Sequence, residues 1–308
     1  MTLQQLKYIC MVEKYGSITR AAQVLYISQP GISNMIHALE EELGITIFTR
    51  SPSGVAPTEE GRELIRMAQQ LLSDADHVGT YFRENAKGSG RPRFLVSSQH
   101  YDFVVSAYTD FINEVDGEYG RYLLSLCETS TASVIEEVQR QRSSLGIIYI
   151  PGSERRYMER NLADQGLVFH SLAVTGPYVF LSENHPLAGR KSLALEDLRP
   201  YPCLEYLQDE DSPSFYSEEV PIPDFHPDKV ICISDLYLSL RFLQSCNAYD
   251  IGTGLLGAGR DDGIVCVPLD VDVQLDVGYI CRDNQQLGQM EKRFLEILAS
   301  KVRKPGSV

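Results

Sequence analysis

The sequence predicts an α/β protein built from three consecutive parts: a winged helix-turn-helix, one long helix and a larger C-terminal domain. Residues 17–43 contain two short helical segments joined by a tight turn. Residues 58–87 carry a single apolar seam at helical spacing, which predicts an uninterrupted helix. From residue 94 onward, short apolar runs alternate with amphipathic helical segments, an order that favours parallel sheets covered by helices.

The helical hairpin near the N-terminus follows an opening helix expected over Leu3–Tyr15. Its first helix is expected over Thr19–Leu25 and its second over residues 28–43. Ser28 is a favourable N-cap residue, and a proline in the first helical turn costs no hydrogen bond. Gly44 readily takes the left-handed conformation that ends a helix.

The second helix of the hairpin has two different faces. Apolar residues at helical spacing should point to a core: Ile32, Ile36, Leu39 and Leu43. The opposite face carries short side chains without formal charge: Gln29, Pro30, Ser33, Asn34 and His37. A solvated face usually carries Lys and Glu, whereas amides and hydroxyls bond to base edges in the major groove. We expect this face, with Ser28 at its start, to contact DNA bases; by itself the pattern fits an ordinary packed hairpin equally well.

A longer ordered set of residues resembles the DNA-binding signature of LysR-type transcriptional regulators. The matching residues are Ala21-Ala22, Leu25, Ser28-Gln29-Pro30, Ser33, Leu39-Glu40, Leu43-Gly44 and Ile47-Phe48-Thr49-Arg50. A match this dense is more specific than a helix-turn-helix pattern alone. Members of that family often carry Arg or Lys near positions 34 and 37 and a basic wing tip. This chain departs from them with Asn34, His37 and Ser51-Pro52-Ser53.

Two short strands are expected to form a wing after the hairpin. They cover Thr46–Thr49 and Val55-Ala56, on either side of a turn rich in Pro and Gly. Arg50 at the edge of the wing and Arg20 on the preceding helix are candidate phosphate contacts. The alternative for both arginines is an ordinary place on the surface.

The long helix is expected over Thr58–Lys87, and a helix of about 30 residues spans roughly 45 Å. Its apolar residues form one seam: Leu64, Met67, Leu71, Ala75, Val78 and Phe82. The small N-terminal domain cannot bury so long a seam, so a second copy of the helix is the expected partner. Packing against the C-terminal domain is the alternative. The family resemblance also implies a dimerising linker helix, and Lys87–Arg93 reads as a hinge.

The C-terminal region begins with a βαβαβ order that implies a parallel sheet with right-handed crossovers. These five elements are Phe94–Ser97, Tyr101–Asn113, Tyr122–Cys127, Ser133–Gln141 and Gly146–Ile150. The later elements are Tyr178–Ser182, Leu195–Leu198, Cys203–Tyr206, Lys229–Ile233, Asp235–Ser245, Asp250–Gly254, Val277–Cys281 and Leu287–Val302. The region is similar to the effector domain of the same family, a two-lobed, periplasmic-binding-like fold. Its matching segments are His185-Pro186-Leu187 and Ile251–Leu256.

Three domains follow from these expectations. A DNA-binding domain covers residues 1–57, and a linker helix with its hinge covers 58–90. The effector-binding domain covers 91–308. Within it, the first lobe is expected at about 91–168 and 269–308, and the second lobe at about 169–268.

Polar residues at the carboxyl ends of the expected strands are candidates for holding a small molecule, because open α/β sheets bind ligands there. They are Ser98, Gln99, Thr129, Tyr149, Glu205, Tyr206 and Thr253. The alternative for the hydroxyl-bearing Ser98, Ser130 and Thr131 is helix capping. Free N–H groups after Ser98-Gln99 suit a carboxylate or another anion. Glu205 instead suggests a ligand with an amine, or pairing with an arginine.

Composition narrows the function classes. The 308-residue chain has a net charge of −14, so general affinity for nucleic acid is not expected. Residues 1–90 hold eight Lys/Arg and ten Asp/Glu, which favours few phosphate contacts per subunit and several modules acting together. The seven cysteines form no C-x-x-C pair, so reduced thiols are expected and a redox pair is the minor alternative. No membrane span, signal peptide, metal-ligand spacing or catalytic motif is recognised.

Three glycines near the C-terminal end of the second lobe are spaced as in a dinucleotide-binding motif. Gly252-x-Gly254-x-x-Gly257 fits the dinucleotide fingerprint, but Arg260-Asp261-Asp262-Gly263 signals a turn where that fingerprint requires a helix. No cofactor is therefore expected.

Without a recognised signal peptide or membrane span, the protein is expected in the cytoplasm. The resemblance implies a DNA-binding regulator, not an enzyme, whose promoter binding is modulated by a small metabolite between the two C-terminal lobes. Its expected partners are double-stranded DNA, further copies of itself as a dimer or tetramer, and RNA polymerase. One alternative is a solute-binding or enzymatic α/β protein with an accessory helical dimerisation domain. Another is a structural dimer with a degenerate recognition helix.

Overall fold

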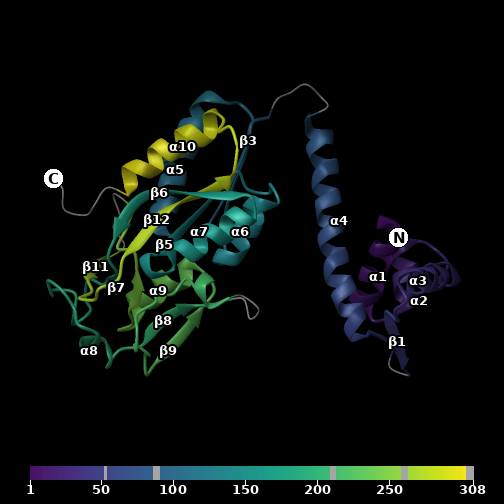
Figure 1. Ribbon diagram of the computed structural model, residues 1–308, viewed down its shortest axis with the longest axis horizontal. Helices are drawn as coiled ribbons and strands as arrows, with labels where there is room; N and C mark the ends of the chain where they lie inside the picture. Colours follow the sequence, from purple (N-terminus) through teal and green to yellow (C-terminus); the bar gives the residue numbers. More distant parts are fainter. Residues whose placement is uncertain (52–53, 86–90, 209–212, 258–262, 303–308) are drawn as a thin grey trace. The chain divides into compact units, whose positions relative to one another are not determined.

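The computed structural model has two compact units, Met1–Arg91 and Pro92–Val308, and each is described by itself. Figure 1 shows the chain coloured along the sequence. The residues described are 1–51, 54–85, 91–208, 213–257 and 263–302. Within these ranges, no helix combines the length and apolar character that crossing a membrane requires.

The N-terminal unit has the expected order of three helices, a hairpin and a long helix. Its elements are α1 (Leu3–Tyr15), α2 (Ile18–Leu25), α3 (Gln29–Leu43), β1 (Phe48–Ser51), β2 (Gly54–Pro57) and α4 (Glu59–Asn85). Ser17 and Ser28 cap α2 and α3, and their hydroxyls accept bonds from backbone N–H groups at 3.3 and 3.2 Å. Gly16 and Gly44 end α1 and α3 with φ of 58° and 69°.

The core of this unit comes from one face of each helix. Its fully buried members include Ile9, Val12, Ala21, Ile32 and Leu39. Ile36 is also buried. The apolar face expected for α3 is therefore confirmed at Ile32, Ile36 and Leu39. Leu43 differs, because it is the last residue of α3 and remains 38% exposed.

In the hairpin, β1 begins two residues later than expected and β2 is longer than expected, and the hairpin is anchored to the end of α1. β1 and β2 pair antiparallel from Phe48 opposite Pro57 to Ser51 opposite Gly54. The Val55 N–H donates to the Gly16 carbonyl at 3.0 Å. At Gly54, with φ of +133°, a Cβ would lie 2.6 Å from that same oxygen, so glycine is required for the close approach.

The long helix α4 carries two apolar surfaces rather than one. Ile65 and Ala68 are 4% and 1% exposed and belong to the core of the N-terminal unit. In contrast, Met67, Leu71 and Val78 of the expected seam are 49%, 47% and 56% exposed. Position 82 lies in α4, but its side chain is outside the described part, and residues 86–90 of the expected hinge are outside it altogether.

The first lobe of the C-terminal unit is built on a five-stranded sheet in the order β4-β3-β5-β12-β6. Its elements are β3 (Arg93–Ser98), α5 (Asp102–Glu118), β4 (Leu123–Glu128), α6 (Thr131–Gln139), β5 (Leu145–Pro151), η1 (Gly152–Glu154), α7 (Arg155–Asp164), β6 (Leu167–Thr175), β12 (Leu275–Arg282) and α10 (Gln289–Lys301). β3, β4 and β5 are parallel, as expected. β12 is antiparallel to both β5 and β6, so the complete sheet is mixed, a feature on which the sequence made no prediction.

The second lobe contains two smaller sheets. Its elements are β7 (Tyr178–Ser182), α8 (Leu195–Leu198), β8 (Cys203–Tyr206), η2 (Ser214–Tyr216), β9 (Val230–Ile233), α9 (Leu236–Ser245), β10 (Asp250–Gly252) and β11 (Ile264–Pro268). β7 lies between β10 and β11, and β8 pairs with β9 in parallel. The lobe boundary expected near residue 168 falls inside β6, which pairs with β12 as far as Thr175.

Helices cover both faces of the large sheet. Ile147 and Tyr149 of β5 belong to the core formed with α5 and α10, whereas Ile148 and Ile150 belong to the core formed with α6 and α7. All seven residues of β5 are buried for this reason. Figure 1 shows α5 and α10 together on one side of this sheet. The covered sheet is a rigid frame for the loops at its carboxyl edge.

Candidate functional site

The N-terminal unit presents the predicted DNA-reading face to solvent. Gln29, Pro30 and Asn34 are exposed on α3, and Ser33 is half-buried between them. Ser28 is exposed as the N-cap of α3, and Arg20 is exposed on α2. Arg50 lies in β1 opposite Val55, but its side chain is outside the described part. The uncharged face therefore begins at the helix N-terminus, where unpaired N–H groups also favour phosphate.

One member of this face already has a partner in its own chain. The His37 side chain is 65% exposed, and its Nδ1 lies 3.2 Å from Glu40 Oε2. The other carboxylate oxygen of Glu40 accepts the Ile47 N–H at 2.8 Å. Glu40 thus fixes the start of the wing against α3 and places a negative charge beside His37.

Tyr26 is a surface residue that the sequence analysis did not select. It follows α2 in the left-handed conformation, with φ of 54°, and its side chain is 95% exposed. So exposed an aromatic ring between the two helices of the hairpin is available to a partner. The only signal in the sequence was its position in the tight turn.

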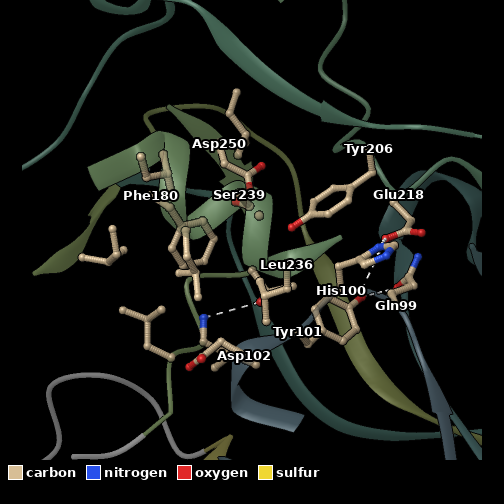
Figure 2. Close-up of a pocket in the computed structure, with 18 of the residues that line it drawn as sticks. Gln99, His100, Tyr101, Asp102, Phe180, Tyr206, Glu218, Leu236, Ser239 and Asp250 are labelled. Atoms are coloured by element: carbon tan, nitrogen blue, oxygen red, sulfur yellow. Dashed lines mark hydrogen bonds and ion pairs between the residues drawn. The ribbon is translucent and has the colours of Figure 1, made fainter. Parts of the chain in front are cut away.

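The C-terminal unit contains a cavity between its two lobes, with about 680 Å³ of space unoccupied by protein atoms, open mouth included. Figure 2 shows ten of its lining residues by name. From the first lobe come Gln99, His100, Tyr101, Asp102 and Tyr149. From the second lobe come Phe180, Tyr206, Glu218, Glu219, Leu236, Ser239, Leu240, Leu243, Asp250, Ile251, Gly252, Thr253, Leu255, Leu256 and Ile264.

A buried ion pair joins the lobes at this cavity. His100 Nδ1 lies 2.8 Å from Glu218 Oε2, and the two side chains are 6% and 5% exposed. Burial alone would lower the pKa of His100, but the hydrogen bond and charge of Glu218 outweigh it, so the pKa is raised. The imidazole also stacks on the Tyr206 ring, with centroids 4.3 Å apart.

Gln99 connects the end of β3 to the start of α6 and to β5. Its Nε2 donates to Thr131 Oγ1 at 2.5 Å, and its Oε1 accepts the Tyr149 N–H at 3.0 Å. The Tyr101 hydroxyl donates to the same Oε1. Tyr149 in turn donates its hydroxyl hydrogen between the Glu218 and Glu219 carbonyls, 3.1 and 3.0 Å away. These bonds hold the loop that carries both glutamates against the first lobe.

Two further carboxyl groups in the cavity have perturbed acidity. Loss of water around Asp250 raises its pKa to about 7, although the Ile251 N–H and Ser239 favour its charged form. Burial and the nearby Asp250 also raise the pKa of Glu219, whose Oε1 accepts the Tyr206 N–H at 2.8 Å. Asp250, Ser239 and the Tyr206 hydroxyl lie on one side of the cavity (Figure 2).

The structure brings together four of the seven predicted effector residues. Gln99, Tyr149, Tyr206 and Thr253 line the cavity. Ser98, Thr129 and Glu205 do not. The buried Ser98 hydroxyl donates to the Gln99 carbonyl, and the Thr129 N–H donates to the Ser98 carbonyl at 2.9 Å.

Glu205 is excluded from the lining by strand alternation. Leu204 and Tyr206, its neighbours in β8, are buried on the core side, and Glu205 points away from them. The capping alternative applies to Ser130 instead, whose Oγ accepts the Ser133 N–H of α6 at 3.3 Å. Ser98 does not cap α5, because the N-cap there is Tyr101.

Most of the polar part of the cavity was not predicted. His100 directly follows Gln99 at the end of β3, but the adjacent Glu218 and Glu219 and the later Asp250 are far from it in sequence. Nothing in the sequence around Glu218 signals a site, because the segment reads as an ordinary acidic loop. Asp250 opens the short strand β10, where a charged residue alone is not diagnostic.

The three glycines of the dinucleotide-like motif serve close packing. A Cβ at Gly252 would lie 2.8 Å from the Phe180 ring, and one at Gly254 would lie 2.3 Å from the Tyr178 ring. A Cβ at Gly257 would lie 2.7 Å from Ser106. No helix follows β10 in the described residues up to 257; residues 260–262 lie outside them.

The described residues contain neither a candidate metal site nor a disulfide bond. No cluster of His, Cys, Asp and Glu that could hold a metal ion occurs among them. All seven cysteines fall within the described ranges, and every one is a free thiol.

Comparison with known proteins agrees with this architecture. Residues 3–62 match the family described as bacterial regulatory helix-turn-helix protein, lysR family. Residues 102–303 match the LysR substrate binding domain. The two matches place a DNA-binding and a ligand-binding module in the same order as the two units of the structure.

Curated relatives match most or part of this chain. The HTH-type transcriptional regulator SsuR of Burkholderia cenocepacia is 26% identical over 296 residues, which cover 93% of this chain and 86% of that protein. The regulator CysB of the same species is 28% identical over 208 residues, which cover 67% of this chain and 63% of CysB.

Solved structures share the fold. The crystal structure of CbnR, a LysR family transcriptional regulator, has a TM-score of 0.61 at 18% identity and covers 99% of this chain and 100% of that chain. Full-length CbnR complexed with its target DNA gives the same TM-score over 98% of this chain. Members of this family are transcription factors rather than enzymes, as the sequence analysis expects. This chain therefore belongs to the LysR family and is a DNA-binding transcriptional regulator with a C-terminal effector-binding domain.

Proposed function

We propose that the exposed N-terminal face of α3 reads the bases of an operator. Gln29 and Ser33 supply amide and hydroxyl groups, and Pro30 offers an apolar contact to a thymine methyl. Asn34 and His37 extend the contact along the groove, although His37 is shared with Glu40. The observation that carries this proposal is the exposure of an uncharged helix face that starts at the Ser28 cap.

Arg20 and Arg50 contact phosphates in the same complex. Arg20 lies on α2, which crosses the backbone in a helix-turn-helix, and Arg50 lies in the wing. Few other positive charges occur in the N-terminal unit, so two units acting on an inverted repeat supply the affinity.

Self-association through α4 supplies that pairing. The exposed Met67, Leu71 and Val78 lie on one stripe of the helix and are covered by α4 of a second copy. In this arrangement residues 1–57 bind DNA, residues 58–90 pair and space the modules, and residues 91–308 bind the effector. The protein acts in the cytoplasm, where DNA and RNA polymerase are available to it.

A small effector in the cavity between the lobes changes the activity of the DNA-bound protein. Gln99, Tyr149, Tyr206 and Thr253 contact it, while Ser98 and Thr129 shape the backbone around it. The effector acts by binding one arrangement of the lobes more tightly than another, which is the only way a ligand can shift such an equilibrium.

Fluorescence anisotropy with the DNA upstream of the protein's own gene tests the DNA-reading part. Gln29→Ala and Ser33→Ala should each lower the affinity about fivefold or more, since a good base contact contributes about 1–3 kcal/mol. Gln69→Ala, which removes an exposed glutamine from α4, is the matched control and should bind like the wild type. Equal affinity of all four proteins for this DNA would contradict the assignment.

A further inference from the structure

The cavity between the lobes is acidic. Its described lining includes four carboxylates and one histidine: Asp102, Glu218, Glu219, Asp250 and His100. No lysine or arginine occurs among the described lining residues. His100 pairs with one of the carboxylates, Glu218, so the lining has more acidic side chains than basic ones.

One carboxylate oxygen of Glu218, a residue of the cavity lining, has no hydrogen-bond partner in the described structure. Its Oε2 pairs with His100, but its Oε1 is buried and has no hydrogen-bond partner within the described structure. A buried acceptor without a donor is unfavourable, and more so when it carries charge. A ligand with N–H donors removes this cost.

The helix N-termini at the cavity do not favour an anion. α5 begins with Asp102, whose Oδ2 accepts the Gly257 N–H at 2.6 Å. α9 is capped by Asp235, whose Oδ1 accepts the Leu238 N–H at 2.9 Å. Since both helix ends already hold a carboxylate of the chain, an anionic ligand would meet like charge there. The anion expected after Ser98-Gln99 is thus disfavoured.

The rest of the wall is apolar. Phe180, Leu236, Leu240 and Ile264 face the space from α9 and the small sheet. A hydrated inorganic ion gains nothing from such a wall, and no metal-binding group occurs among the described residues. A ligand that matches both the acidic and the apolar part of the lining has one charged end and one apolar end.

We infer that the cavity binds a small organic cation, a protonated primary amine with an apolar body. Its ammonium group lies beside Glu218 and Asp250, and its apolar body packs on Phe180 and the leucines of α9. The inference rests on the proposed function, because it assigns the chemical class of the effector. The amine recognition expected of Glu205 is assigned instead to Glu218, in a loop, and to Asp250, the first residue of β10.

Two sets of small molecules test this inference. Within each set the apolar group is the same, and the polar end is an amine, an alcohol or a carboxylate. Isothermal titration calorimetry on the full-length protein at pH 8 uses isoamylamine, isoamyl alcohol and 4-methylpentanoate. A second set uses phenethylamine, 2-phenylethanol and 3-phenylpropionate. At least one amine should bind at least tenfold more tightly than its alcohol and its acid.

Three variants test which carboxyl groups contact the bound amine. Glu218→Gln and Asp250→Asn should each weaken binding of that amine at least tenfold, whereas Glu205→Gln should change it less than twofold. The amide of Glu218→Gln still accepts a bond from His100, so loss of affinity reports charge rather than collapse. Unchanged amine affinity in both cavity variants would overturn the inference.

The remaining outcomes distinguish failure of the amine assignment from failure of the proposed function. Preferred binding of the acid or the alcohol overturns the cationic ligand and leaves an effector cavity standing. Absence of binding by all six probes overturns the ligand class. Operator affinity measured on the same samples tests the DNA-binding function independently, because it needs no ligand.

Discussion

The imidazole of His100 lies almost parallel to the ring of Tyr206, with 9° between the planes and 4.3 Å between the centroids. His100 follows the central sheet of the first lobe, and Tyr206 ends β8 of the second. The same imidazole pairs with Glu218. One side chain therefore links the two lobes by stacking and by charge, at the place where a ligand would enter.

The first prediction concerns this link. His100→Ala should lower the free energy of unfolding by about 3–5 kcal/mol, because it leaves the Glu218 carboxylate buried without a counter-ion. In a Glu218→Gln background the same substitution should cost at least about 1 kcal/mol less, since no charge is stranded. Urea denaturation of the four proteins in this cycle measures the coupling. Strictly additive effects would show that the pair is not coupled.

The second prediction concerns pH. The folded-state pKa of Asp250 is about 7, above the value of about 3.9 expected in the unfolded chain. The folded protein thus holds this proton more tightly, and the stability it contributes below about pH 4 is lost as the pH rises through 7. Glu218, Glu219, His100 and the Tyr206 hydroxyl face the same group.

Asp250→Asn should therefore reduce the loss of melting temperature between pH 6 and pH 8. A difference of at least about 2–4 °C is expected, the shift that 1 kcal/mol produces in a domain of this size. Glu219 also has a raised pKa, so part of the wild-type slope should remain. The exposed Asp270→Asn is the control and should keep the full slope. Identical slopes in all three proteins would refute the assignment.

The third prediction concerns assembly. Leu71 is 47% exposed on the outer stripe of α4, where a lysine would place a charge in the helix pair. Leu71→Lys should raise the dimer dissociation constant at least about tenfold, which corresponds to about 1.4 kcal/mol. Gln69→Lys adds the same charge to another exposed face and should leave assembly unchanged. Sedimentation velocity over a range of concentrations distinguishes the two; equal behaviour would place the interface elsewhere.

The fourth prediction concerns packing beneath the large sheet. A Cβ at Gly146 would lie 2.6 Å from Val134, 2.8 Å from Ile280 and 2.9 Å from Val138. Gly146→Ala should therefore cost about 1–3 kcal/mol through overpacking. Gly117 lies in α5, and a Cβ there would meet no atom within 4 Å, so Gly117→Ala should add up to about 1 kcal/mol through helix propensity. Thermal unfolding that ranked the two variants in the opposite order would disprove this account.

The sequence was most informative where structure depends on near neighbours. The α1 bounds, the Ser28 cap and the Gly44 end of α3 were predicted because capping and helical periodicity act within a few residues. β7, α8 and β8 match their predicted bounds for the same reason. In contrast, α7, β6 and β11 were missed, since their side chains are only partly buried and show no clear period.

Other features depended on contacts between distant residues. The face of α4 that carries Ile65 and Ala68 is defined by α1 and not by the seam visible in the sequence. The direction of β12 depends on where the chain re-enters the first lobe after forming the second. Neither is encoded in a local pattern.

The sequence by itself determined the helix-turn-helix and the uncharged face of its second helix, the long helix and the α/β character of the rest, because spacing and capping are local properties. The tertiary structure alone decided the chemistry of the cavity. His100 and Glu218 form a buried pair, and Asp250 has a raised pKa, only because the folded lobes exclude water from between them. Desolvation and charge pairing depend on distance in space and not on separation in sequence.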